Sequence, residues 1–587
     1  MIQNFTRKKF EYIIFFLLSL TYILLLFGMI KIHYQELASI TDVNIYDAMK
    51  QHNWKYWFEE SDQYQTVFSK FLQFTDIYYL HSRGILPIGI NISFIFLFAG
   101  LISIIIHNIF QSKENHNTLI QLVLMFYTII LLFSAMQDSS IVWMFNQQLF
   151  AAYFFPLLSY YLLVKFSITK NHRYFYALLV SGMMIIIATP YYFSALIVLF
   201  LMGYVFKIGW LKNLLIFMLI LLSFFLYFNE MSNSTTMLSL FSGDMAIKTS
   251  FYVLSYLGSL FVYVSFEPCI ATSSVLGGIF IIGTFIYFSY LAVNKKVTEP
   301  IYWVILAFLL FYILTAFGSL SEIQDRDIII FKNKYMTPSL IAWSLIPILY
   351  MHHFHTARVL QRRILTLSMT LIVVLFFYQI FTYRQYKKDI SELNLAVLSL
   401  KFDIDDQRSL KSITRHSYTM MYCPSKEFEK QMSIFTVDDI RAKAIQNKVN
   451  LLKEINPFYL TDEVMKNSLR ENKLVPANTN QALQGGLDKI ISIDKKKNII
   501  RILGWVYNMK EKKVPKWLMV LDENENIIGY IITGELRKDV EMIYGKDAIR
   551  SGFIGYIRYS KIPTTLFMVD EFGKKILRVK YPNTELK

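Results

Sequence analysis

A short stretch of mixed charge, Ser321–Ser339, interrupts two apolar runs and holds residues that could do chemistry. Its candidate binding residues are Arg326, Lys332, Lys334 and Tyr335. Lys and Arg side chains beside an apolar run can hold an anionic group at a membrane surface. They can also simply anchor a helix end at the interface, and a solvated loop is the third interpretation.

Carboxylates form a second charged group, in region 32–85. Asp42 and Asp47 are the first candidates for catalysis, because Asp42 lies nearest to the preceding apolar run, and Glu59 and Glu60 rank second. A carboxylate at a membrane face can act as a general base or hold a divalent cation such as Mg²⁺ or Mn²⁺. The sequence assigns no metal site and no definite cofactor, and a solvated amphipathic loop is the alternative for each acid.

The composition sets the class of protein that must position these residues. The chain has 587 residues, of which 55% are hydrophobic and 17% charged, and its mean hydropathy is +0.39. Uncharged runs of about 18 residues recur, and each is long enough to cross a hydrocarbon core of about 30 Å. The sequence therefore predicts a mainly α, polytopic membrane protein. The net charge of +16 fits cytoplasmic Lys and Arg plus a basic tail, and nucleic-acid binding is not expected.

About eleven spans are predicted from the apolar runs. They are residues 12–31, 86–109, 118–136, 142–164, 174–189, 191–206, 213–228, 274–293, 301–320, 336–352 and 364–383. Basic connections then fall on one side, which the positive-inside rule makes cytoplasmic. This predicts a multi-pass protein of the cell (inner) membrane with a cytoplasmic N-terminus and an extracytoplasmic C-terminal domain. It requires that Phe251–Phe266 does not cross, so we expect an interfacial or re-entrant helix there.

The soluble part of the chain begins where the apolar runs end. We expect a transmembrane domain over 1–383, a helical linker over 384–486 and a small β-sandwich over 487–587. The last region has short runs rich in Val, Ile and aromatic residues, separated by turn residues, which is typical of strands. No catalytic constellation lies in this tail.

Histidine and cysteine give no metal signal. His352, His353 and His355 are spaced like a cluster, but they lie beside basic residues on the predicted cytoplasmic side, where we interpret them as an anchor. Cys269 and Cys423 lack the spacing of a metal site and cannot form a disulfide framework.

Several segments together resemble a known class of membrane enzyme. "KNKYMTPSLIAWSLIPIL" before a late span, "ELNLAVLSLKFDID" after the last span and "ILGWVYNMKEKK" in the tail are similar to segments of bacterial GT-C-like proteins from surface-polysaccharide gene clusters. The chain reads Lys334-Tyr335 where that pattern has Arg-Tyr. It also lacks a tight Asp-Asp or Asp-Glu pair in the first loop.

The resemblance implies a GT-C-like glycosyltransferase of the hexosyltransferase type. Such an enzyme moves a sugar from a polyprenyl-phosphate donor to a surface glycan (O-antigen, capsule or teichoic type) outside the cytoplasmic membrane. Its partners would be the lipid-linked donor, the glycan acceptor and membrane lipid. Asp42 or Asp47 would act as the base, and Arg326, Lys332, Lys334 and Tyr335 would bind the donor phosphate. A flippase for lipid-linked glycans, a polysaccharide polymerase or ligase, and a non-catalytic scaffold are the alternatives.

Overall fold

The chain divides into two compact units, one holding the helices before residue 384 and one holding the C-terminal strands. The computed structural model describes residues 17, 19–28, 30, 67–80, 85–111, 118–134, 137, 141, 147–188, 191–231, 244–263, 272–294, 299–318, 336–354, 357, 359–377, 380, 483–494, 498–515, 517–522, 527–558, 565–570 and 576–580. The predicted linker 384–486 falls outside this set except for its last four residues.

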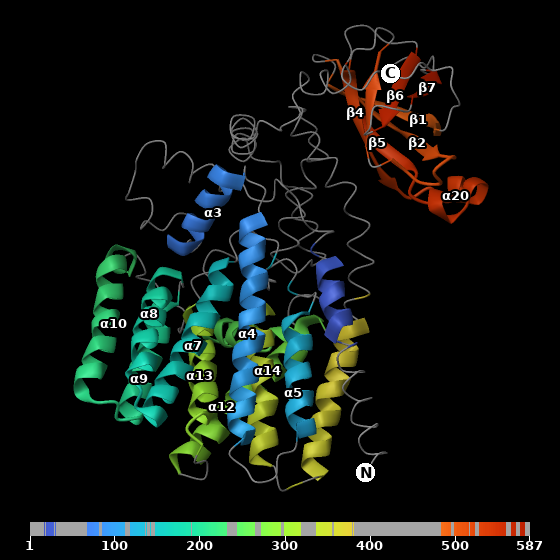
Figure 1. Cartoon of the computed structure of the whole chain (residues 1–587). Coiled ribbons are helices and arrows are strands. Elements are labelled where there is room, and N and C mark those ends of the chain that lie inside the picture. The colour runs from blue at the N-terminus through green and yellow to red at the C-terminus, as the bar shows by residue number, and fades with distance from the viewer. Residues whose placement is uncertain are drawn as a thin grey trace. The chain divides into compact units, whose positions relative to one another are not determined.

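The first unit is a bundle of helices (Figure 1). Its apolar runs form helices because a helix satisfies its backbone hydrogen bonds within one segment. The bounds are α3 Val67–Leu80, α4 Ile85–Gln111, α5 Thr118–Leu132, α7 Gln147–Thr169, α8 His172–Ala188, α9 Tyr192–Val205, α10 Trp210–Met231, α11 Asp244–Leu257, η4 Ser259–Tyr263, α12 Thr272–Val293, α13 Tyr302–Gly318 and α14 Met336–His353. Residues Ser19–Gly28 and Val359–Phe377 are helical as well.

Four of these helices are long and apolar enough to cross a membrane. They are Leu86–Phe110, Phe150–Thr169, Ser274–Val293 and Val359–Phe377, and several others are apolar but shorter. The prediction of a mainly helical chain with membrane-compatible helices is therefore confirmed among the described residues. The finer count of eleven spans stays a prediction.

Helix α14 forms the centre of the bundle. Its side chains from Met336 to Leu349 are all buried, and it packs against α4, α5, α7, α13 and η4. Pro347 lies inside this helix, and Pro156 lies inside α7. A proline inside a helix leaves the carbonyl four residues earlier without its N–H partner. In a membrane bundle, groups on neighbouring helices can satisfy that carbonyl, so the helix tolerates the proline.

The structure describes residues 251–263 of Phe251–Phe266, the segment predicted as an interfacial or re-entrant helix. These residues form the end of α11 followed by η4, and the two elements contact α12, α13 and α14. Tyr256, Leu257 and Leu260 have no solvent exposure. At 14 residues, α11 is about 21 Å long, shorter than the roughly 30 Å of a hydrocarbon core.

The second unit is one antiparallel sheet of seven strands, in the order β1-β2-β5-β4-β3-β6-β7. The strands are β1 Leu483–Asp494, β2 Ile499–Asn508, β3 Trp517–Leu521, β4 Ile527–Glu535, β5 Gly552–Arg558, β6 Thr565–Asp570 and β7 Ile576–Lys580, with helix α20 Lys538–Tyr544 before β5. The core includes Ile500, Ile502, Val520, Ile531 and Met568.

The predicted β-sandwich is therefore wrong in its architecture, since a sandwich needs two sheets face to face. Here one sheet curls into a half-barrel, and its terminal strands β1 and β7 approach each other. Register shifts lie at Leu487/Lys489, Val520/Leu521 and Thr533/Glu535. Such bulges bend strands and raise the local twist, which curves a sheet. The sheet also begins at Leu483, earlier than the predicted start at 487.

Candidate functional site

The start of α14 is the described point closest in sequence to the predicted cations. Met336, the first residue of α14, directly follows Lys334 and Tyr335. The Thr337 hydroxyl donates a hydrogen bond of 3.2 Å to Oε1 of Gln137. The Gln137 amide in turn donates to the carbonyl of Leu132, at the end of α5. The first turn of α14 is thereby tied to α5.

The other side of this turn is tied to α11 and η4. The Ser339 hydroxyl accepts a hydrogen bond from the backbone N–H of Leu260 at 3.2 Å. It also lies 3.5 Å from the carbonyl of Leu257, to which it can donate. Because Ser339 is completely buried, these contacts fix α14 between two elements that are far apart in the sequence.

A buried tyrosine cluster continues from this point into the bundle. The hydroxyls of Tyr153 in α7 and Tyr256 in α11 are 2.7 Å apart, and Thr315 of α13 lies 3.4 Å from each. Tyr312 donates to the backbone carbonyls of Tyr256 at 3.0 Å and Leu257 at 3.2 Å. All three tyrosines are fully buried. This uncharged network connects α7, α11 and α13, and the sequence analysis did not identify it.

Helix α3, the last part of region 32–85, docks beside the start of α4. It packs against α4, α7 and α8. The Asp76 carboxylate accepts a hydrogen bond of 3.1 Å from the backbone N–H of Leu86. Carboxylates at a helix start are favoured because the first N–H groups lack partners within the helix. The one acid of this region that the structure describes therefore has a capping role.

Helix α3 buries polar side chains and exposes aromatic ones, the reverse of an ordinary surface helix. Lys70 and Gln73 are buried together with Asp76, whereas Phe71 is 56% exposed and Tyr79 67% exposed. A helix that turns aromatic side chains outward is suited to an interface with lipid, where Tyr and Phe rings are stable.

The starts of α4 and α14 lie at the same end of the bundle. Helices α4 and α5 pack together, and Gln137, which follows α5, bonds to Thr337 at the start of α14. Near the start of α4, Asn91 donates to the carbonyl of Ile141 at 2.9 Å. The described elements that directly follow region 32–66 and the stretch 319–335, which are α3 with α4 and the start of α14, therefore lie at one end of the bundle.

All eight predicted site residues lie outside the described residues. They are Asp42, Asp47, Glu59, Glu60, Arg326, Lys332, Lys334 and Tyr335. Their proximity to one another stays a prediction, and only the elements that flank them are described.

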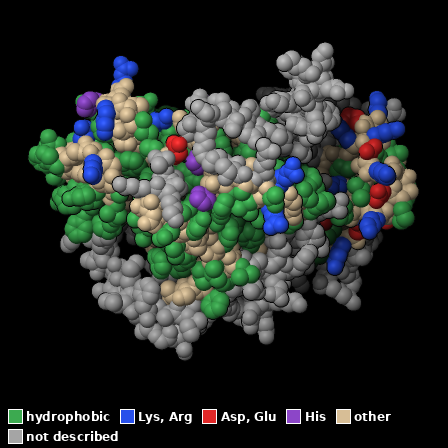
Figure 2. Space-filling view, turned by 90° about the horizontal axis from the view of Figure 1, so that it is seen from below, with side chains coloured by type: hydrophobic (Ala, Val, Ile, Leu, Met, Phe, Trp, Pro, Cys, Tyr) green, Lys and Arg blue, Asp and Glu red, His purple; other side chains and the backbone are tan. Residues whose placement is uncertain are grey.

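The opposite end of the bundle carries basic residues at the helix turns. Lys170 lies between α7 and α8, and Lys207 lies between α9 and α10. Lys165 donates to Asn108 at 2.8 Å, and the Lys212 ammonium lies 5.1 Å from the Phe166 ring centroid. Figure 2 views the molecule from this end, with Lys, Arg and His side chains on a largely hydrophobic face.

The two described histidines of the "HHFH" motif pack on aromatic side chains. The His352 ring lies 5.0 Å from that of Tyr302, and His353 Nε2 lies 3.3 Å from the Tyr287 hydroxyl. Within the described ranges, no three His, Cys, Asp or Glu side chains are grouped to hold a metal ion.

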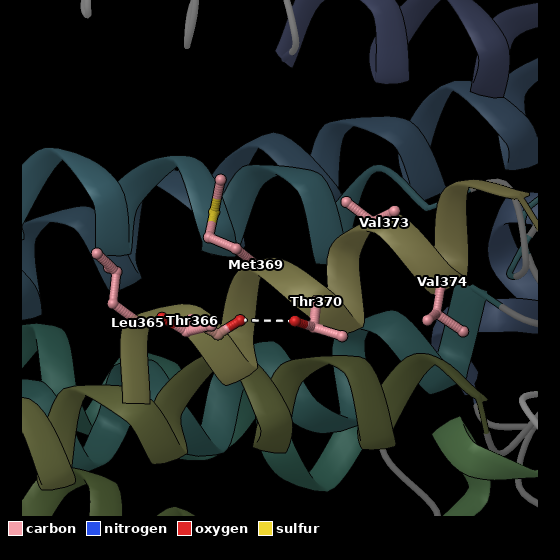
Figure 3. Close-up of a pocket in the computed structure, with 6 residues that line it drawn as sticks. All are labelled: Leu365, Thr366, Met369, Thr370, Val373 and Val374. Carbon is pink, nitrogen blue, oxygen red and sulfur yellow. Dashed lines mark hydrogen bonds between the residues drawn. The ribbon is translucent and has the colours of Figure 1, made fainter. Parts of the chain in front are cut away.

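A shallow groove on helix Val359–Phe377 offers no chemistry of its own. Its volume is about 390 Å³, and one helix supplies its lining: Leu365, Thr366, Met369, Thr370, Val373 and Val374 (Figure 3). The Thr370 hydroxyl bonds to the carbonyl of Thr366 at 2.9 Å. Because the polar groups point to their own backbone, the face is apolar and suits lipid contact.

Comparisons of the chain with protein-family models, with curated proteins and with solved structures give no match.

Proposed function

We propose that this chain is an integral-membrane glycosyltransferase of GT-C-like architecture. It transfers a sugar from a polyprenyl-phosphate donor to a surface glycan on the extracytoplasmic face. The observation that carries the proposal is that the elements directly following two charged regions of the sequence begin at the same end of the helix bundle. The acid-rich region ends in α3, which Asp76 docks on α4, and the cation-rich stretch leads directly into the buried start of α14.

The membrane placement has two sources of support. In the described part of the chain a helix overlaps each of the eleven apolar ranges, and four of these helices are long and apolar enough to cross a membrane. Lys165, Lys170, Lys207 and Lys212 lie at the end of the bundle opposite the start of α14, as the positive-inside rule requires for a cytoplasmic end. The charged regions then belong to the extracytoplasmic face, and the C-terminal half-barrel does too.

The chemistry divides between the two regions. Arg326, Lys332 and Lys334 stabilise the charge of the departing phosphate, and Tyr335 adds a hydrogen bond. Asp42 or Asp47 takes the proton of the acceptor hydroxyl, with Glu59 and Glu60 as second choices. A divalent cation such as Mg²⁺ or Mn²⁺ would fit the same acids, and the mechanism does not require one.

A flippase for lipid-linked glycans is less favoured. Transporters place ionisable groups near the middle of the membrane. In the described parts of the apolar helices, the buried polar groups are Tyr, Ser, Thr, Asn and Gln, with His352 at the end of α14. The buried Lys70 and Asp76 belong to α3, next to the start of α4. A polymerase or ligase would share the cations, and product length separates it from a transferase.

The test is the surface glycan of native cells that express Asp42→Asn, Asp47→Asn or Arg326→Ala at matched membrane levels. Lys170→Gln, at the opposite end of the bundle, is the control. Loss of one sugar from glycans of normal length supports the transferase, and shortened chains support a polymerase. Unchanged glycans in all three variants would remove the proposed site.

A further inference from the structure

An open groove lies between α9 and α10, at the end of the bundle opposite the proposed site. Its volume is about 630 Å³. The side chains that matter are Phe200, Tyr204 and Lys207 from the α9 side and Trp210, Asn213 and Phe217 from α10. The two helices are antiparallel neighbours connected by residues 206–209. The groove is open along its length; we call its end at the turn the mouth and its other end, farther along both helices, the deep end.

The polarity of the groove changes from its mouth to its deep end. Lys207 and Trp210 are at the mouth, and both are exposed, Trp210 by 74%. Tyr204 and Asn213 come next. The deep end is aromatic, with the rings of Phe200 and Phe217 5.9 Å apart. Since α helices rise about 1.5 Å per residue, this gradient from charge to hydrocarbon extends over about 10 Å.

The surface beside the groove is apolar and exposed. On α10, Met218 is 53% exposed and Phe225 is 81% exposed, and the leucines Leu211, Leu214, Leu215 and Leu221 are each more than 40% exposed. A continuous apolar surface of this kind fits hydrocarbon. Trp210 at the mouth and Tyr204 next to it fit the headgroup level, where such residues are enriched.

Asn213 places a polar group at middle depth. Its Oδ1 is buried and has no hydrogen-bond partner among the described residues. The side chain packs on Gly203, where an added Cβ would come within 2.1 Å of that oxygen. That oxygen faces Gly203, so the group that Asn213 offers to a lipid in the groove is its Nδ2, which can donate to an ester oxygen.

We propose that this groove binds one anionic glycerophospholipid of the bilayer. The Lys207 ammonium holds the phosphate, Trp210 and Tyr204 flank the headgroup, and Phe200 and Phe217 contact the start of an acyl chain. The Nδ2 of Asn213 donates a hydrogen bond to an ester oxygen of the lipid. The site would anchor the α9–α10 pair at the membrane surface away from the chemistry. It uses the membrane placement of the proposed function and does not depend on glycosyl transfer.

Lys207 has a matched control in Lys170. Both are exposed, both follow the end of a helix, and both have positive φ, 48° and 56° respectively. Lys170 lies at the turn between α7 and α8 and does not line the groove. Lys212 is not equivalent, because its ammonium lies over the rings of Phe166 and Phe175. Comparing Lys207 with Lys170 therefore separates a lipid site from general surface charge.

The test is native mass spectrometry of the delipidated full-length protein with dioleoyl phosphatidylglycerol or dioleoyl phosphatidylcholine. We expect tighter retention of phosphatidylglycerol. Lys207→Gln should weaken it by about fivefold, the contribution of one basic residue near anionic lipid. Lys207→Arg and Lys170→Gln should keep the retention of phosphatidylglycerol. Trp210→Ala should weaken the retention of both lipids.

Two results would overturn the proposal. One is equal retention of both lipids by the wild-type protein, and the other is an equal loss in Lys170→Gln and Lys207→Gln. Membrane fractionation of the same protein tests the placement separately. A protein that sits in the membrane but does not discriminate between the lipids rejects this site and leaves the proposed transferase standing.

Discussion

The Thr337 hydroxyl and the Gln137 side-chain oxygen lie 3.2 Å apart in a hydrogen bond, and both residues are buried. The bond connects positions 200 residues apart in the sequence. It fixes the first turn of α14 against the end of α5. Any group held by Lys334 and Tyr335 thus depends on a helix start whose position is set by buried polar contacts.

Thr337→Val should lower the free energy of unfolding by about 1–3 kcal/mol, since it keeps the side-chain shape but leaves a buried amide oxygen without this donor. Thr337→Ser keeps the hydroxyl and should cost less. The measurement is the unfolding of purified protein in mild detergent. A double variant with Gln137→Leu should cost less than the sum of the single changes. Additive costs would show that the bond contributes nothing.

Glycines of α12 allow α11 to approach closely. A Cβ on Gly278 would lie 2.1 Å from the carbonyl oxygen of Leu254, whereas Gly283, one and a half turns later, has nothing within 4 Å. Gly278→Ala should therefore force the two helices apart and lower the melting temperature. Gly283→Ala should leave it equal or raise it, because alanine favours a helix by about 1 kcal/mol over glycine. Equal melting temperatures for the two variants would contradict this packing.

Local patterns predicted much of the fold. Uncharged runs such as Leu86–Phe110 form helices because a helix satisfies its backbone hydrogen bonds within one segment, as an apolar solvent requires. The strands β2 to β7 follow the short runs rich in Val, Ile and aromatic residues. The half-barrel was missed, because curvature comes from bulges such as that at Val520/Leu521, which depend on pairing between strands.

Long-range contacts were beyond the reach of sequence patterns. Tyr153 and Tyr256 are 103 positions apart, and periodicity within one segment cannot indicate such a pair. Asp76 shows the same limit. The sequence does not distinguish Asp76 from the other acids of region 32–85. In the structure its carboxylate caps α4, which begins several residues later.

The ion pair on the half-barrel should make this unit sensitive to acid. Arg537 binds Asp539 through hydrogen bonds of 2.6 and 2.9 Å and also pairs with Asp488. The hydrogen bonds from Arg537 lower the pKa of Asp539 from 3.8 to about 2. A carboxylate with a lowered pKa stabilises the folded state above its unfolded pKa, and that stabilisation is lost as the pH falls.

The expected loss of folding stability begins below about pH 4 and is complete near pH 2. It should be small because Asp539 is exposed. This loss of stability is measured by hydrogen exchange of the α20 backbone amides in the full-length protein, with a correction for the intrinsic exchange rate at each pH. Asp539→Asn should remove most of the pH dependence in this window. Lys513 and Glu511, an exposed pair on the turn after β2, offer a control in Glu511→Gln. The same pH response in both variants would rule out the Arg537 contact as its source.

Substitution of Asp76 should lower stability, whereas substitution of Asp42 should lower the rate of sugar transfer. Asp76→Ala should cost about 0.5–2 kcal/mol of stability through loss of the cap, whereas Asp76→Asn keeps an acceptor and should cost less. Sugar transfer per folded molecule should stay near wild type in both Asp76 variants.

Asp42→Asn should keep the melting temperature and lower transfer by about 10²–10⁴-fold if Asp42 is the base. Sugar transfer from a polyprenyl-phosphate donor in proteoliposomes, normalised to folded protein, compares them. A loss of transfer in Asp76→Asn as large as that in Asp42→Asn, at an unchanged melting temperature, would contradict a purely capping role for Asp76.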